Sequence, residues 1–242
     1  MPAGLTVITG GTAGVGLALA RRLAHQGGQV VVCGRDRTRV AAANARPGIE
    51  ALRCDLTVES DIASLAAELH ARGGIRLLVN NAAVQFGYRV AEHDRDDVLR
   101  DVDTEIGTNL TGPVKLTALL LPLMLPGSTI VNITSALALT PKRSAPLYCA
   151  TKAALRSYTT ALRYQLADDE RGIRVVEAML PLVDTAMTAG RGSGKISPEH
   201  AARELLEGLD RNRSVVHVGK IRALVALHRL SPALAARLLR DS

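Results

Sequence analysis

Short apolar runs alternate with amphipathic stretches along the whole chain. The runs with the length and composition of β-strands are residues 5–9, 29–33, 50–54, 77–80, 129–133, 173–180 and 215–218. Apolar strands that alternate with helical segments are typical of a parallel sheet covered by helices on both faces. The pattern therefore predicts an α/β fold with a doubly wound parallel sheet.

Helical periodicity fills the segments between these strands. One apolar face is formed by residues at i, i+3, i+4 and i+7, namely Ile62, Leu65, Ala66 and Leu69. Further helices are predicted over residues 14–26 and 147–166. Residues 97–125 have the pattern of long helical material, in which Pro113 marks a first turn and Pro122 an end.

A cap signal marks the start of one more helix. Ser197 precedes Pro198 and Glu199, and a capping serine, a proline at the first position and an acid in the first turn are typical of a helix N-terminus. The polar, glycine-rich segment before it predicts a mobile substrate lid over residues 185–200.

The chain has 242 residues, of which 47% are hydrophobic, enough for one sizeable core. No linker or repeat interrupts it, so residues 1–242 are expected to form a single domain. Residues 220–242 form an amphipathic tail broken by Pro232. Its apolar face could cover the substrate pocket, pack on a neighbouring subunit or lie on an anionic membrane surface, and the first two are favoured because such a face should be buried.

Composition narrows the classes of partner. No apolar run reaches about 18 residues, so no transmembrane segment is expected, and the N-terminus lacks the pattern of a signal peptide. Three cysteines and six histidines show no metal spacing, so a cytoplasmic protein without a metal site is expected. The net charge is +7, but aromatic residues make up only 2%, and nucleic acid is not the expected partner.

A glycine-rich turn directly follows the first predicted strand and opens the first helix. Glycines there let the backbone approach a pyrophosphate, whose charge lies at the helix N-terminus. A plain glycine turn is the weaker alternative. The residues expected to contact a dinucleotide are Gly10, Thr12, Ala13, Gly14, Val15 and Gly16.

The end of the second strand bears on the choice between NADP and NAD. Gly34 stands where an acid would bind the ribose 2′-hydroxyl of NAD, and Arg35 follows it. Because arginine offers a fork of donors to a 2′-phosphate, NADP(H) is favoured. Asp36, one position later, keeps NAD open.

Polar residues also follow the third and fourth strands. Asp55 would either accept a hydrogen bond from an adenine amine or cap the next helix, or do both. Asn81 and Ala82 lie in the same layer, where small residues leave room for ribose and nicotinamide.

Ser135, Tyr148 and Lys152 form the candidate catalytic set. Tyr148 and Lys152 are four residues apart, on one face of a helix. Tyr148 would exchange a proton with a carbonyl oxygen, and the Lys152 ammonium would lower the pKa of the phenol and bind the nicotinamide ribose. Ser135 would hold the same oxygen. A half-buried core tyrosine is the structural alternative.

These motifs, in this order, resemble the short-chain dehydrogenase/reductase family, from Leu5 to Val218. The matching segments are TGGTAGVG, Asp55-Leu56, NNAA at 80–83, Ser135 and YCATK. PLVDT at 181–185 and ISPEHAA at 196–202 are similar to a bacterial subgroup of D-alanine-transfer-associated oxidoreductases. The resemblance implies a Rossmann-type fold, a homodimer or homotetramer, a relay role for Asn109, and cofactor contacts at Leu56, Pro181, Val183 and Thr185.

Two positions depart from the family pattern. Ala83 replaces the glycine of Asn-Ala-Gly, and Leu182 replaces the glycine of Pro-Gly, where it is expected to tighten the nicotinamide pocket. The favoured function is NADP(H)-dependent oxidoreduction of a small-molecule carbonyl or alcohol. An NAD-dependent alcohol dehydrogenase and a non-catalytic NADPH-binding redox sensor are the alternatives.

Overall fold

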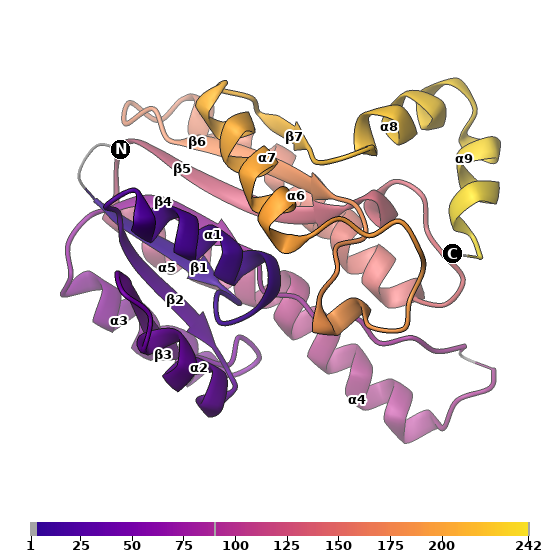
Figure 1. Ribbon diagram of the computed structural model, residues 1–242, viewed down its shortest axis with the longest axis horizontal. Coiled ribbons are helices and arrows are strands. Elements are labelled where there is room, and N and C mark those ends of the chain that lie inside the picture. The colour runs from indigo at the N-terminus through magenta and orange to yellow at the C-terminus, as the bar shows by residue number, and fades with distance from the viewer. Residues whose placement is uncertain (1–3, 90, 242) are drawn as a thin grey trace.

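Seven parallel strands form one sheet in the order β3-β2-β1-β4-β5-β6-β7 (Figure 1). The computed structural model describes residues 4–89 and 91–241. Its strands are β1 (Leu5–Thr9), β2 (Gln29–Gly34), β3 (Ile49–Arg53), β4 (Ile75–Asn80), β5 (Met124–Ser135), β6 (Arg174–Leu180) and β7 (Val215–His217). The predicted doubly wound parallel sheet is confirmed.

Helices cover both faces of this sheet. Buried residues of one face pack against α1 (Gly14–His25), α2 (Arg37–Asn44) and α7 (Pro198–Asp210). Those of the other face pack against α3 (Glu59–His70), α5 (Gly112–Leu120) and α6 (Pro146–Ala167). Two apolar layers therefore hold the sheet between them, as strands without a polar face require.

The winding of the chain reverses between β1 and β4. From β1 the sheet grows through β2 to β3 on one side, and from β4 through β7 on the other. The loops that leave the carboxyl ends of β1 and β4 therefore diverge to opposite faces. Ligands of open α/β sheets bind in the crevice at such a reversal.

A chain of buried amide and hydroxyl groups joins β4 and β5 to the helices behind them. The Asn80 Nδ2 donates to Thr117 Oγ1 at 3.1 Å and to Asn132 Oδ1 at 2.8 Å, and the Asn132 Nδ2 donates to Thr159 Oγ1 at 2.9 Å. Asn80, Asn132 and Thr159 are fully or almost fully buried. These bonds fix α5 and α6 against β4 and β5, so that α6, which carries Tyr148 and Lys152, is held beside the strand that ends at Ser135.

The segment predicted as long helical material is divided into several elements. It contains α4 (Arg95–Ile106), a π-helical turn η1 (Gly107–Thr111), α5 and a 3₁₀ turn η2 (Leu121–Leu123). β5 begins at Met124, because Met124 pairs with Ile75 of β4. An apolar run around a proline does not distinguish the end of a helix from the start of a buried strand. The short, polar helix α2 was not predicted at all.

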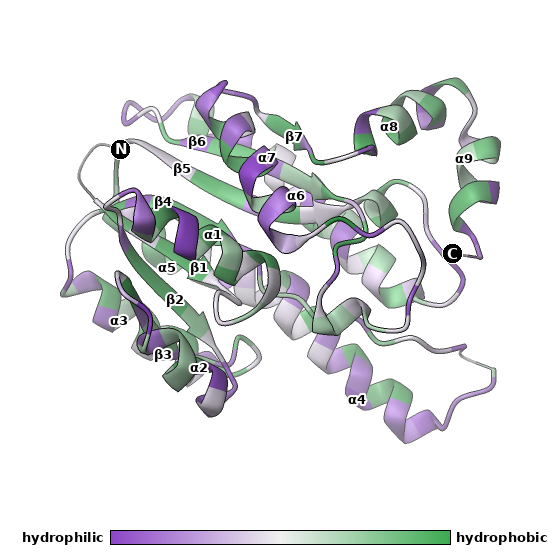
Figure 2. Cartoon of the chain, viewed as in Figure 1, coloured by the Kyte–Doolittle hydropathy of each residue, from purple (hydrophilic) through white to green (hydrophobic). Residues whose placement is uncertain are grey.

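The tail forms α8 (Ile221–Leu230) and α9 (Pro232–Leu239), divided at Pro232 as predicted (Figure 2). Ile221 is buried against Ala136 and Met179, so the tail packs on the segment that follows Ser135. Leu230 stays 86% exposed. Among the described residues, no helix is both long and apolar enough to cross a membrane.

Candidate active site

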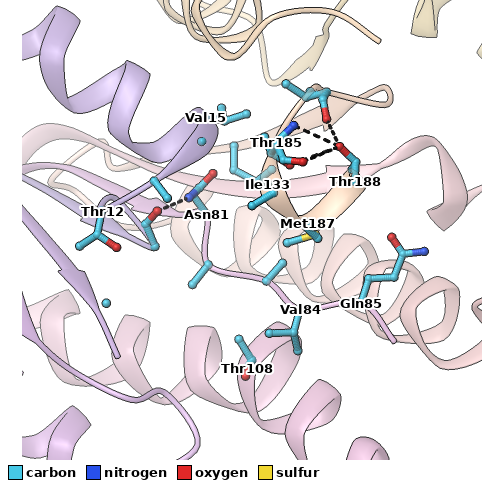
Figure 3. Close-up of a pocket in the computed structure, with 18 of the residues that line it drawn as sticks. Thr12, Val15, Asn81, Val84, Gln85, Thr108, Ile133, Thr185, Met187 and Thr188 are labelled. Carbon is cyan, nitrogen blue, oxygen red and sulfur yellow. Dashed lines mark hydrogen bonds between the residues drawn. The ribbon is translucent and has the colours of Figure 1, made fainter. Parts of the chain in front are cut away.

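A cavity of about 690 Å³ opens at the carboxyl ends of the strands, where the winding reverses (Figure 3). The loops after β1, β2, β3, β4 and β6 contribute to its wall, together with the end of β5 and one face of α6. All predicted site residues line this cavity except Gly16 and Asn109. Residues far apart in the sequence thus come together at one edge of the sheet.

The glycine-rich turn brings the backbone close to the loop after β4. Gly10 has a φ of 63°, and a Cβ atom there would lie 2.8 Å from the Ala82 Cα. No side chain caps α1, and its first turn contains no acid, so its leading N–H groups are left for an anion. Gly16 does not line the cavity; a Cβ there would lie 2.5 Å from the Asn81 Nδ2, so this glycine serves packing.

Asn81 braces this turn. Its Nδ2 donates to the Gly10 carbonyl oxygen at 3.3 Å (Figure 3) and to the Thr9 carbonyl oxygen at 2.9 Å. The backbone N–H groups of Asn81 and Ala82 both donate to Thr9 Oγ1 at 3.0 Å. Asn81 therefore joins the two loops at the reversal, besides lining the cavity.

Two exposed arginines lie on the rim beyond β2. Arg35 and Arg39 both line the cavity, and Asp36 stands between them. The Asp36 Oδ1 accepts from the Arg39 N–H at 2.9 Å, so this carboxylate caps α2. At position 34 a Cβ would lie 2.7 Å from the Thr12 Oγ1, so this backbone leaves no room for an acidic side chain there.

Asp55 and Leu56 also line the cavity, after β3. The Asp55 Oδ1 accepts from Thr57 N at 3.0 Å and Thr57 Oγ1 at 2.8 Å. Val58 is the cap residue of α3, so the expectation that Asp55 caps this helix is wrong. The Asp55 carboxylate closes the turn before the helix and faces the cavity.

Ser135, Tyr148 and Lys152 all line this cavity. Ser135 ends β5, and the other two lie on α6, with the Lys152 Nζ 5.7 Å from the centre of the Tyr148 ring. Lys152 is buried, and its Nζ donates to the Ile133 carbonyl at 2.9 Å. The three side chains therefore converge as their spacing predicted.

Burial dominates the protonation of this group. It raises the pKa of the Tyr148 hydroxyl to about 12, although the neighbouring Ser135 hydroxyl and the positive charge of Arg191 act in the opposite direction. Burial also lowers the pKa of the Lys152 ammonium to about 8. The expected lowering of the Tyr148 pKa is therefore reversed, because desolvation of the phenol outweighs the charges around it.

Asn109 lies in the π-helical turn, fully buried. Its Oδ1 accepts from the Val84 N–H at 2.8 Å, and its Nδ2 donates to the Val84 carbonyl at 2.8 Å and to Thr151 Oγ1 at 3.2 Å. Its side chain thus holds the loop after β4 against α6. π-helical turns occur frequently at functional sites.

Glu105, one turn earlier, supports the same loop. Its Oε1 accepts from the Phe86 N–H at 3.0 Å, while its buried Oε2 has no hydrogen-bond partner among the described residues. Burial raises the pKa of this carboxyl to about 7, and the positive charge of Arg191 partly opposes the shift. The Arg191 Nη2 donates to the Gln85 carbonyl at 3.1 Å, so Glu105 and Arg191 hold adjacent residues of the loop.

The segment after β6 covers the cavity from the side of α7. Pro181, Val183 and Thr185 line it, and the base of the segment is held by a bridge between Val183 and Ile196. Leu182 does not line the cavity; a Cβ on Gly192 would lie 2.7 Å from its Cδ2. The expectation that Leu182 tightens the pocket is wrong, because this side chain lies against Gly192 and is not part of the cavity wall.

Several residues at the site were not predicted. Arg39 lies in α2, which was not predicted from the sequence, and its place at the rim depends on that helix. Glu105 sits in a charge run that resembles a solvated helix face, and only packing distinguishes it. The other unpredicted lining residues include Gln85, Phe86, Thr108 and Ile133, whereas Met187 and Thr188 fall within the predicted lid. Among the described residues no cluster could hold a metal ion.

The model of the short chain dehydrogenase family matches residues 5–195. An uncharacterized oxidoreductase of Bacillus subtilis (strain 168), DltE, is 36% identical over 228 residues, which cover 90% of this chain and 89% of that protein. An uncharacterized oxidoreductase of Staphylococcus epidermidis is 30% identical over 196 residues, or 79% of this chain and 83% of that protein. These matches confirm the resemblance inferred from the motifs.

Solved structures agree with this fold. A short-chain dehydrogenase from Sphingobium yanoikuyae in complex with NADPH is 26% identical, with a TM-score of 0.81 and coverage of 98% of this chain and 94% of that chain. A short chain dehydrogenase from Burkholderia cenocepacia in complex with NADP has a TM-score of 0.86 at 24% identity, with coverage of 99% and 98%. A Burkholderia phymatum protein in complex with NAD has a TM-score of 0.84 at 23% identity, with coverage of 99% and 96%.

The raised pKa of Glu105 predicts a specific dependence of stability on pH. The folded pKa of about 7 exceeds the ordinary value of 4.5, so the native state binds the proton more tightly and loses stability as the pH rises through this window. Glu105→Gln keeps an acceptor for Phe86 but cannot ionise. The free energy of unfolding is measured with urea for this variant and the wild type. From pH 5 to pH 8, the value for the variant should rise by about 2–3 kcal/mol relative to that of the wild type.

Asp103→Asn, on the exposed side of the same helix, is the matched control and should keep a constant difference from the wild type. A constant difference for Glu105→Gln as well would contradict the assignment of a buried, proton-binding carboxyl.

Proposed function

Because this chain belongs to the short chain dehydrogenase family, we propose that it is an NADP(H)-dependent oxidoreductase that acts on a carbonyl or secondary alcohol compound. The observation that carries the proposal is the convergence of Ser135, Tyr148 and Lys152 in a cavity that the glycine-rich turn also lines. A non-catalytic NADPH sensor would have no need of this convergence. The fold and the family support a nicotinamide-dependent oxidoreductase.

The cavity suits a dinucleotide. The uncapped N-terminus of α1, with the Cβ-free Gly10 beside it, would hold the pyrophosphate, and Asp55 and Leu56 would lie beside the adenine. Lys152 would bind the nicotinamide ribose, near Asn81 and Ala82. The wall after β6, formed by Pro181, Val183 and Thr185, would then lie against the nicotinamide end of the cofactor.

Arg35 and Arg39 favour NADP over NAD. Both are exposed on the rim, whereas Asp36 between them is engaged by the Arg39 N–H. Two guanidinium groups beside the ribose would complement a 2′-phosphate and offer nothing specific to a 2′-hydroxyl. The bound cofactors of structural relatives include NADPH and NAD. The proposed preference of this chain for NADP therefore rests on Arg35 and Arg39 at its own rim.

Tyr148 would exchange the proton of the reaction. When bound, the nicotinamide cofactor supplies or accepts the hydride. In the reductive direction the Tyr148 hydroxyl gives its proton to the carbonyl oxygen, which the Ser135 hydroxyl holds beside it. The raised pKa of the phenol keeps it protonated at neutral pH, which suits a donor. Lys152 would then return a proton to Tyr148 through a water molecule held at Asn109.

The segment of residues 185–200 is proposed to act as the substrate lid. Thr185, Met187 and Thr188 contribute to the cavity wall from it. The Thr188 Oγ1 donates to the Val183 carbonyl and accepts from the Thr185 N–H at 3.1 Å, which closes the first turn of the lid (Figure 3). A small-molecule substrate would thus be enclosed between the lid and the loop after β4.

The protein is proposed to work in the cytoplasm and to act without a nucleic-acid partner. Fractionation of cells that express a tagged chain would test the location.

Tyr148→Phe tests the catalytic proposal. The substitution removes the hydroxyl and keeps the ring, so binding of NADPH should change less than threefold while consumption of NADPH with a panel of aldehydes and ketones falls by at least about a hundredfold. Tyr158→Phe, on the same helix but outside the cavity, should keep wild-type rates. Equal turnover by Tyr148→Phe and the wild type would remove Tyr148 from the chemistry.

Arg35→Ala tests the cofactor preference. Loss of a charged contact to a phosphate should raise the Kd for NADPH by about ten- to a hundredfold and leave the Kd for NADH nearly unchanged. Both can be measured by fluorescence titration. Arg37→Ala, an exposed arginine of α2 that does not line the cavity, is the matched control. If the wild type bound NADH more tightly than NADPH, the NAD-dependent alternative would replace this proposal.

The protein is proposed to form a homodimer or homotetramer through the outer face of α5 and α6. Tyr164 on α6 is 70% exposed and Leu119 on α5 is 48% exposed. Leu238, 60% exposed on α9, marks the other surface on which a second copy could pack. If the chain remained a monomer, the apolar side chains of both faces would stay exposed to water.

Sedimentation velocity distinguishes these surfaces. The wild type should sediment as a multiple of 25.6 kDa, and Tyr164→Asp should shift it to the monomer, while Leu238→Asp should leave it assembled. The opposite pattern would place the interface on the tail, and a monomeric wild type would refute the assembly.

A further inference from the structure

Arg191, from the proposed lid, lines the same cavity as Tyr148. It stands between Gly190 and Gly192, whose φ values of 72° and 52° lie in the left-handed region. Its N–H donates to the Thr188 carbonyl at 3.0 Å. This turn needs glycines on both sides of Arg191, so the backbone of the lid is specialised for the position at which the arginine stands.

The Arg191 guanidinium makes a single hydrogen bond among the described residues. Its Nη2 donates to the Gln85 carbonyl, and its Nη1 is buried without a hydrogen-bond partner. Within residues 4–89 and 91–241, no carboxylate forms an ion pair with it. The other cation of the lid differs, since the Lys195 Nζ lies 3.6 Å from Asp184 and donates to the Thr188 carbonyl at 2.6 Å.

Glu105 does not take the place of that missing partner. It lies close enough for the Arg191 charge to lower the pKa of its carboxyl. Its Oε1, however, is bound to the Phe86 N–H, and its Oε2 makes no hydrogen bond to Arg191 or to any other described residue. Arg191 and Glu105 hold consecutive residues of the loop, and the Arg191 Nη1 is left without a hydrogen-bond acceptor among the described residues.

The position of Arg191 fits the far end of a substrate whose carbonyl lies at Tyr148. Both residues line the same cavity, and the Arg191 charge acts on the Tyr148 hydroxyl through it. The wall beside them is largely apolar, with Val84, Phe86 and Met187. A substrate with a short apolar chain between its carbonyl and an anionic group would match Tyr148, the apolar wall and Arg191 in that order.

We propose that Arg191 recognises a carboxylate on the substrate, so that the compound oxidised or reduced is a hydroxy acid or an oxo acid. A planar guanidinium binds a carboxylate through two parallel hydrogen bonds, a geometry that also fixes the distance from the carboxylate to the carbonyl. The inference rests on the proposed function, because it uses the position of the carbonyl at Tyr148. The excess of positive charge on the chain, +7, would favour approach of such an anion.

Paired substrates test the assignment. Oxo acids with the carbonyl at successive positions are compared with their methyl esters, which keep the skeleton and lose the charge. Arg191→Met should lower kcat/KM for the preferred acid by at least about tenfold, mainly through KM, and change the value for its ester by less than about threefold. Lys195→Met, the matched lid variant, should change neither. Equal losses for acid and ester would overturn the proposal.

A binding measurement separates this proposal from the catalytic one. Calorimetry follows the same oxo acids and the corresponding hydroxy acids as they bind the wild-type protein saturated with NADP⁺ or NADPH. Binding that is lost in Arg191→Met and partly restored in Arg191→Lys supports the carboxylate site even if no turnover occurs. If no acid binds, or if Arg191→Met weakens NADPH itself by tenfold or more, Arg191 is not a substrate residue and the proposal is wrong.

Discussion

The loop after β4 determines the shape of the site, because residues 81–89 have no regular secondary structure and must find partners for their backbone groups elsewhere. Side chains from distant elements supply those partners: Asn109 binds both backbone groups of Val84, Glu105 binds Phe86 N, and Arg191 binds the Gln85 carbonyl. The same loop begins at Asn81, which holds the glycine-rich turn. The glycine-rich turn, the π-helical turn and the proposed lid are therefore linked through one strip of backbone.

Burial gives this site its electrostatic character. The pKa of Tyr148 is raised and that of Lys152 is lowered by desolvation, and neither group has an oppositely charged partner within hydrogen-bond distance among the described residues. A phenol that stays protonated and an ammonium that gives up its proton readily form a pair suited to proton exchange near neutral pH. Glu105 is a third buried group. Its pKa of about 7 means that the carboxyl is partly protonated and partly ionised near neutral pH. Burial therefore shifts the pKa values of three neighbouring groups at this site.

The sequence predicted those parts of the molecule that local pattern controls. Apolar runs identified the seven strands, and the spacing of Tyr148 and Lys152 placed them on one helical face, as found. Helix α2 was missed because its residues are polar and alanine-rich, without an apolar face to reveal a period. Glu105 and the orientation of Leu182 were beyond prediction, because each depends on which tertiary neighbour occupies the adjacent space. Pattern reveals which residues reach the sheet edge, and packing decides which of them face the cavity.

Transfer of hydride to a carbonyl carbon is the central claim, and deuterium transfer measures it most directly. The protein would be incubated with NADPH carrying deuterium at C4 of the nicotinamide, together with a mixed set of aldehydes, ketones and oxo acids, and the products analysed by mass spectrometry. The account predicts an alcohol that carries one deuterium on the carbinol carbon and is absent with Tyr148→Phe. Bound, intact NADPH with no deuterated alcohol from any carbonyl compound would contradict the account and favour a protein that holds the cofactor without using it.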